Sequence, residues 1–75
     1  MSLFTLDLHG VRHHEVGLEV ENFIFLNQEH APLIIICGNS ARMIELVSNF
    51  LDKHKIEYYP GKGFDYGRIT IFKIW

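Results

Sequence analysis

The sequence predicts an α/β fold, a two-layer sandwich in which two helices pack on a mixed four-stranded sheet in the order β-α-β-α-β-β. Two apolar, strand-like segments are each followed by a segment with helical periodicity. The last third of the chain holds two short β-rich segments separated by a glycine-rich loop. Two successive strand–helix units favour a parallel pair with right-handed crossovers, and the final two strands are expected to form a hairpin.

Length and composition favour one small folded domain, residues 1–75. Hydrophobic residues make up 48% of the 75 residues and aromatic residues 13%, which is enough apolar material for a core and argues against disorder. Seven basic against nine acidic residues give a net charge of −2. This balance argues against a protein that grips duplex nucleic acid through its overall charge, but it leaves room for a local basic site.

The cysteine content and the hydropathy favour a cytoplasmic protein. A single cysteine, Cys37, excludes an internal disulfide and suits a reducing compartment. The longest apolar run, from Leu33 to Cys37, is far too short to cross a bilayer, and no signal peptide is expected before the first strand. We therefore expect no membrane partner.

The first strand–helix unit occupies the first thirty residues. Alternation from Phe4 to Leu8 predicts a strand with one buried face. From about Val11 to Glu29 the period changes to that of an amphipathic helix, which Ala31-Pro32 ends. The predicted buried stripe of this helix consists of Val16, Val20, Phe23 and Ile24.

The second unit begins with the isoleucine-rich run from Leu33 to Cys37, which predicts a central strand covered on both faces. A turn follows, in which either Asn39 or Ser40 is the expected cap of a helix from about Ala41 to His54. Its predicted stripe is Ile44, Val47 and Leu51, flanked by Met43 and Phe50.

The last two strands are predicted from Ile56 to Tyr59 and from Arg68 to Trp75. The loop between them contains "GKGFDYG", which lacks the Gly-Lys-Ser/Thr ending of a Walker motif and leads into a strand rather than a helix. The favoured role of this segment is a flexible loop. Lys62, Tyr66 and Arg68 remain candidates to contact a nucleic-acid backbone or to stack on a base.

Candidate chemistry gathers where the first two strands end. If these strands are parallel, His9-Gly10 and the turn at residues 37–40 lie at the same edge of the sheet. The second turn also opens a helix, whose free N–H groups favour a phosphate. Gly38 permits close backbone approach, and Arg42 can add a charge-assisted contact.

Asp7 and His9 share one face of the first strand because strand side chains repeat every two residues. An aspartate beside a histidine can fix its tautomer and support it as a general base. The alternative is structural: Asp7 caps a turn or pairs with a lysine, and His9 fills the end of a strand.

The residues of this first unit resemble a known family. "LDLHG" (6–10), followed by "VRHHEV" (11–16), is similar to the opening motif LDLHGxxxxEA of the Smr (small MutS-related) domain. "GRITIFKI" (67–74) is similar to the closing G-x-T-x-x-x-L stretch of that family. The resemblance spans nearly the whole chain, from about Leu6 to Ile74, and it implies the same order of strands and helices.

The resemblance implies nucleic-acid binding and, as in several members of the family, endonuclease activity on DNA or RNA. By motif position, Asp7 and His9 are the implied catalytic residues. The second signature of the family, H-G-x-G, falls on "CGNS" (37–40), where Cys37 replaces the histidine and Ser40 the second glycine. A thiol is a poor substitute for an imidazole at neutral pH. Either His9 alone suffices, or the protein binds without cutting.

The candidate nucleic-acid- or phosphate-binding residues are Gly10, Arg12, Gly38, Asn39, Ser40, Arg42, Lys62 and Arg68. No cofactor is expected. His9, His13 and His14 are close in sequence, but no Cys/His spacing resembles a zinc site. A magnesium ion held by Asp7 and substrate phosphates stays open.

Some apolar residues fall outside the predicted core. Leu18, Phe25 and Leu26 lie off the main stripe of the first helix, and Trp75 ends the chain. A second copy of the chain or a larger protein partner is one explanation for this apolar surface. The other is that a small domain simply exposes a few apolar groups.

Overall fold

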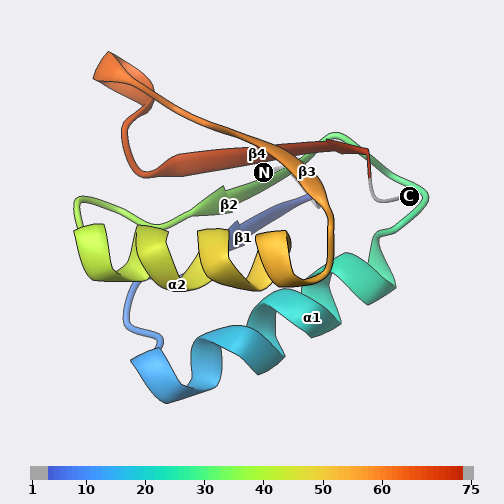
Figure 1. Cartoon of the computed structure of the whole chain (residues 1–75), viewed down its shortest axis with the longest axis horizontal. Coiled ribbons are helices and arrows are strands. Elements are labelled where there is room, and N and C mark those ends of the chain that lie inside the picture. The colour runs from blue at the N-terminus through green and yellow to red at the C-terminus, as the bar shows by residue number, and fades with distance from the viewer. Residues whose placement is uncertain (1–3, 74–75) are drawn as a thin grey trace.

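The structure is a computed structural model that describes residues 4–73. A four-stranded mixed sheet forms one layer, and two helices on one of its faces form the other (Figure 1). The strands β1 (Thr5–Asp7), β2 (Leu33–Ile36), β3 (Glu57–Pro60) and β4 (Arg68–Lys73) lie in the order β1-β2-β4-β3. The helices are α1 (Val16–Leu26) and α2 (Ala41–Lys53). The predicted fold class is confirmed.

The strand pairing determines which ends of the sheet meet. β1 and β2 are parallel, with Thr5 opposite Ile34 and Asp7 opposite Ile36. β4 lies antiparallel between β2 and β3, so the last two strands form the predicted hairpin. The parallel pair therefore delivers the carboxyl ends of β1 and β2 to one edge of the sheet.

The core lies between the sheet and the helices. Leu33 and Ile35 of β2 are fully buried against the helices, whereas Ile34 and Ile36 are only partly buried. An unbroken apolar run predicts cover on both faces, and this expectation is wrong for β2. Both helices lie on one face, because the chain returns from α2 to the sheet as a hairpin and supplies no third layer.

The first helix starts later than its periodicity predicts. A 3-10 turn, η1 (His13–Glu15), precedes α1 at Val16, whereas the sequence pattern places the start near Val11. The N–H of Val11 instead donates to the carbonyl of Leu8 at 3.0 Å, closing a turn through Gly10. The chain needs this turn to cross from the sheet to the helix layer.

The far end of α1 is also shorter than predicted. The helix ends at Leu26, because Asn27 leaves the helical conformation, and the side-chain amide of Asn27 donates to the carbonyl of Phe23 at 2.9 Å. The four residues of the predicted buried stripe of α1 are nevertheless all buried, namely Val16, Val20, Phe23 and Ile24.

The second helix settles the choice of cap. The hydroxyl of Ser40 accepts a hydrogen bond from the N–H of Met43 at 3.1 Å, so Ser40 rather than Asn39 caps α2. Val47 and Leu51 are buried as predicted. Met43 is also buried, more completely than Ile44, so the stripe is centred one residue earlier in the first turn.

The hairpin differs from its prediction at its ends. β3 begins at Glu57 rather than Ile56, whose N–H donates to the carbonyl of Leu51 at 2.9 Å and completes the turn out of α2. The connecting loop contains a 3-10 turn, η2 (Gly63–Asp65). The predicted last two residues of β4, Ile74 and Trp75, lie outside the described residues. No helix among residues 4–73 is long and apolar enough to span a membrane.

Candidate functional site

Three connections meet at the carboxyl end of the parallel strands, on the left of Figure 1. The N–H of Leu8 donates to the carbonyl of Ile36 at 2.9 Å, so β1 and β2 stay in contact one residue beyond β1. The β1–α1 turn, the β2–α2 turn and the β3–β4 loop all leave the sheet here. We call this edge the loop rim and define it as residues 9–12, 37–42 and 61–68.

Asp7 acts on the backbone of the first turn. Its Oδ1 accepts a hydrogen bond from the N–H of His9 at 2.9 Å, and both side chains are exposed. This is the turn-capping role that the sequence allows. Within the described residues no hydrogen bond joins the carboxylate to the imidazole of His9. The carboxylate therefore positions the chain that carries His9.

Glycines shape both turns of the parallel pair. Gly10 has φ +85° and Gly38 has φ +70°, and a Cβ atom at either position would meet no atom within 4 Å. Both turns thus need left-handed backbone while remaining open to solvent. The two glycines lie at the rim where the sequence predicts backbone approach to a phosphate.

Gly67 joins the second turn to β4, a contact that the sequence analysis missed. Its carbonyl accepts a hydrogen bond from the N–H of Cys37 at 2.6 Å. A Cβ atom at Gly67 would lie 2.0 Å from the carbonyl oxygen of Gly38. A glycine directly before a β-branched strand was the available signal, but it does not identify the partner. The contact holds Arg68, the next residue, beside the β2–α2 turn.

The N-terminus of α2 faces the rim. The hydroxyl of Ser40 accepts the hydrogen bond of the Met43 N–H. The backbone N–H groups of Ala41 and Arg42 therefore remain free to bind an anion. No acidic residue lies in the first turn of α2. The guanidinium of Arg42 pairs with Glu45 one turn along the helix. Both side chains are exposed, so this pair contributes little energy and can be exchanged for a phosphate.

Cys37 does not offer its thiol to the rim. Its side chain is buried in the core, following the alternation of Leu33 and Ile35 along β2. Burial raises the pKa of the Cys37 thiol to about 11, so the thiol is neutral near pH 7. The remaining residues of the second predicted motif, Gly38 to Ser40, form the turn itself.

A hollow on the uncovered face of the sheet extends from the rim. We call it the sheet-face hollow; its volume is about 280 Å³. It brings together the predicted Lys62 and Arg68 and adds Tyr59, which the sequence analysis did not single out. Ile34, Asp65 and Thr70 also line it. Tyr66, the aromatic residue predicted to stack, is exposed but does not line this hollow.

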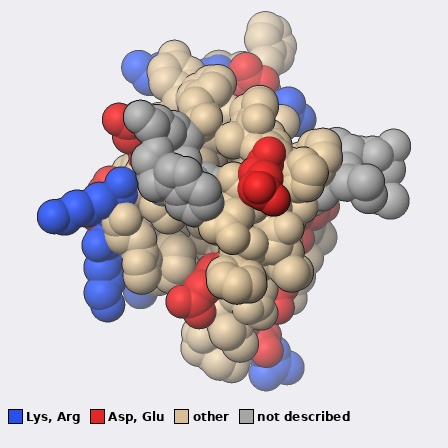
Figure 2. Space-filling view, turned by 90° about the vertical axis from the view of Figure 1, so that its right-hand side faces the viewer, with Lys and Arg blue, Asp and Glu red and all other residues tan. Residues whose placement is uncertain are grey.

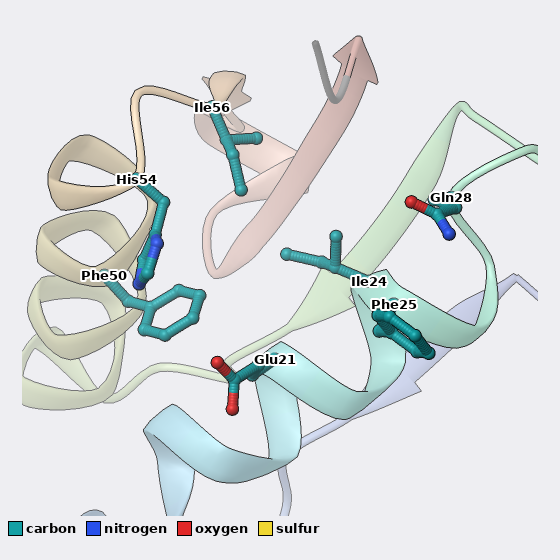
Figure 3. A pocket seen from close by; sticks show the side chains of 7 residues that line it. All are labelled: Glu21, Ile24, Phe25, Gln28, Phe50, His54 and Ile56. Carbon is teal, nitrogen blue, oxygen red and sulfur yellow. The ribbon is translucent and has the colours of Figure 1, made fainter.

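A second, apolar hollow of about 170 Å³ lies between the helices and holds none of the predicted site residues (Figure 3). Ile24 of α1 points toward Phe50 of α2, Phe25 also lines the hollow, and the ring centroids of Phe50 and His54 are 4.4 Å apart. Leu18, Phe25 and Leu26 are more than half exposed, as their positions off the stripe predict. A partner that covers them stays a prediction.

The end of the molecule opposite the rim carries mixed charge. Figure 2 shows this end, the right-hand side of Figure 1, with Asp and Glu side chains over its middle. Most of the Lys and Arg side chains visible there lie along the left margin. The exposed cations that accompany glycine turns and a helix N-terminus are those of the rim: Arg12, Arg42, Lys62 and Arg68.

Two further histidines follow the first turn. His13 and His14 lie in η1 and are exposed. Among residues 4–73, no group of three or more His, Cys, Asp or Glu side chains is placed to hold a metal ion.

Comparisons of the chain with known protein families, with curated proteins and with solved structures find no match. The resemblance of its motifs to the Smr domain is therefore carried by the residues alone.

Proposed function

We propose that this protein is a nucleic-acid-binding, Smr-like domain that cleaves phosphodiester bonds in DNA or RNA. One observation carries the proposal. The parallel register of β1 and β2, with Asp7 opposite Ile36, supports a common site for the His9 turn and the N-terminus of α2. A single phosphodiester can therefore meet an imidazole and an anion-receptive helix start at once.

Binding is electrostatic in this proposal. A phosphate accepts hydrogen bonds from the amides of Ala41 and Arg42, next to the capped turn at Ser40. The guanidinium of Arg42 exchanges Glu45 for the phosphate. Arg12, Lys62 and Arg68 attract the flanking phosphates, although the chain as a whole carries a net charge of −2.

His9 performs the proton transfer. Its imidazole removes a proton from the attacking hydroxyl, which is that of a water molecule or, in RNA, the 2′-hydroxyl of the preceding nucleotide. As the new P–O bond forms, the bond to the leaving oxygen breaks, and the imidazolium returns the proton to that oxygen. Asp7 holds the turn through its hydrogen bond to the N–H of His9 and so keeps the imidazole at the rim. Gly10 supplies the left-handed conformation that lets the turn close after His9.

Cys37 supports a second candidate, a module of the same fold that binds nucleic acid without cutting it. The buried thiol leaves the rim without the second imidazole that the family motif implies. His9 is then the one histidine among the described residues of the rim, so a single imidazole would have to serve both the attacking and the leaving oxygen. This candidate predicts salt-sensitive binding with no loss of substrate.

A cleavage assay separates the two candidates. End-labelled single-stranded RNA, single-stranded DNA of the same sequence and supercoiled plasmid are incubated with the protein, with and without added magnesium. We expect cleavage that is lost in His9→Ala and retained in His54→Ala, since His54 lies at the other end of α2. Equal cleavage by His9→Ala would contradict the proposal. Salt-sensitive binding without any cleavage would support the binding module.

The dependence on magnesium is read from the same assay. Cleavage that continues in a chelator would show that His9 and the rim suffice. Cleavage that requires the added ion would instead give Asp7 a role as a ligand together with the substrate phosphates.

A further inference from the structure

We propose that the sheet-face hollow binds one unpaired nucleotide, with its base against the ring of Tyr59 and a phosphate between Lys62 and Arg68. This inference rests on the proposed function and names its substrate class: single-stranded rather than duplex nucleic acid.

Tyr59 is placed where it can stack on a base. Tyr59 lies opposite Thr70 on β4, and Thr70 lies opposite Ile34 on β2, so the three side chains form one row across the uncovered face. The Tyr59 side chain is 59% exposed even though it lies within a strand. An exposed aromatic ring on a sheet face is the kind of platform on which an unstacked base can lie.

The charged residues that line the hollow suit a phosphate. Lys62 and Arg68 line the hollow, are exposed, and form no ion pair within residues 4–73, where Arg42–Glu45 is the one ion pair found. The lining of the hollow thus holds two positive charges and the single carboxylate of Asp65. A phosphate complements the cations, and the carboxylate can accept a hydrogen bond from an amino group of the base.

The size of the hollow suits one nucleotide, and the strand register places it near the His9 turn. A volume of about 280 Å³ is near the lower end for a small-molecule site, which suits one nucleotide. A base within a duplex is covered on both faces by its neighbours and cannot reach the Tyr59 ring. Arg68 lies opposite Ile36, which in turn lies opposite Asp7. The hollow and the His9 turn are thus about 10 Å apart, or two strand spacings, a short step along a flexible strand.

The test is equilibrium binding by fluorescence anisotropy at low salt. The probes are a labelled single-stranded RNA, the single-stranded DNA of the same sequence, and a hairpin duplex of matched length. We expect both single strands to bind more tightly than the hairpin, with the RNA and DNA arms showing whether the 2′-hydroxyl contributes. A hairpin that binds as tightly as the single strands would overturn the inference.

Variants test each part of the hollow. Tyr59→Ala is expected to weaken single-strand binding roughly 5- to 150-fold, the range for loss of one stacked base. Tyr59→Phe keeps the ring and should bind within about twofold of the wild type. Lys62→Ala and Arg68→Ala should each weaken binding and lower the salt slope by about 0.7. Phe25→Ala, an exposed aromatic on α1, is the matched control and should leave binding unchanged.

The outcomes keep this inference separate from the nuclease proposal. Binding that depends on Tyr59 without any cleavage would retain the hollow and reject the nuclease. Cleavage that depends on His9, with binding unaffected by Tyr59→Ala or reduced equally by Phe25→Ala, would retain the nuclease and reject the hollow. If Tyr59→Ala fails to fold, the Lys62→Ala and Arg68→Ala titrations decide, and their equality with wild type overturns the inference.

Discussion

The backbone of Gly67 lies directly against the carbonyl of Gly38, so closely that even a methyl group at Gly67 would overlap it. The carbonyl of Gly67 also accepts the N–H of Cys37 at 2.6 Å. This contact joins the start of β4 to the turn that opens α2. It is therefore the element that holds Arg68 of the sheet-face hollow beside the proposed phosphate site.

Gly67→Ala should destabilise the protein strongly. The new Cβ would lie 2.0 Å from the Gly38 carbonyl oxygen, and φ at Gly67 is +88°. We expect a loss of at least about 3 kcal/mol in the free energy of unfolding, since strain and overpacking add. Gly63→Ala is the matched control: φ is +61° but nothing lies within 4 Å, so only about 1 kcal/mol of strain is expected. Urea unfolding measures both, and equal losses would contradict the close contact.

Ser40→Ala should cost about 1 kcal/mol of stability because it removes the hydrogen bond from the Met43 N–H to the Ser40 hydroxyl. Ser40→Asp retains an acceptor and should restore most of the loss. Asn39→Ala, one residue earlier, should change stability by less than about 0.5 kcal/mol. Thermal unfolding followed by circular dichroism checks the three variants. A larger loss for Asn39→Ala than for Ser40→Ala would contradict the assignment of Ser40 as the cap.

Two phenylalanines of α1 provide a paired test of the core. Phe23 is 8% exposed and Phe25 is 70% exposed. Phe23→Ala should lower the free energy of unfolding by about 3–5 kcal/mol, through lost burial and the cavity left behind. Phe25→Ala should change it by less than about 0.5 kcal/mol in the monomer. Denaturation at two protein concentrations measures both. A concentration-dependent loss for Phe25→Ala would instead support a second copy of the chain on this helix face.

The Cys37 thiol should react slowly in the folded protein. Burial raises the pKa of the Cys37 thiol to about 11 from the usual 9.0. At any pH below about 11, the folded chain therefore holds a smaller fraction of the reactive thiolate than the unfolded chain does. We expect the reaction with a disulfide reagent at pH 8 to be much slower in the native than in the urea-unfolded protein. The reaction rate of the native protein should still rise above pH 9, whereas the rate of the unfolded protein should level off there because its thiol is already ionised. Equal rates at pH 8 would show that Cys37 is open to solvent at the rim.

The sequence alone was enough for the fold class, because its signals are local. Alternation ending at Leu8, the apolar run from Leu33 and the helical stripe through Val20 each report which face of an element is buried. Two strand–helix units followed by a hairpin then allow few topologies. Element ends were less accurate, as at the start of α1, because the turn through Gly10 depends on the distance from the sheet to the helix layer.

Some features of the candidate site could likewise be predicted from the sequence, and others could not. The sequence by itself placed Asp7, His9 and the α2 N-terminus at strand ends, since motif and periodicity are written along the chain. Only the tertiary structure decided that Asp7 bonds the backbone of His9, that Cys37 turns into the core, and that Tyr59 shares a hollow with Lys62 and Arg68. The sheet-face hollow depends on strand register and on the insertion of β4 between β2 and β3, which bring together residues that are distant in sequence. The other two relationships are local along the chain, but they depend on the conformation of the turn after β1 and on which face of the sheet the helices cover.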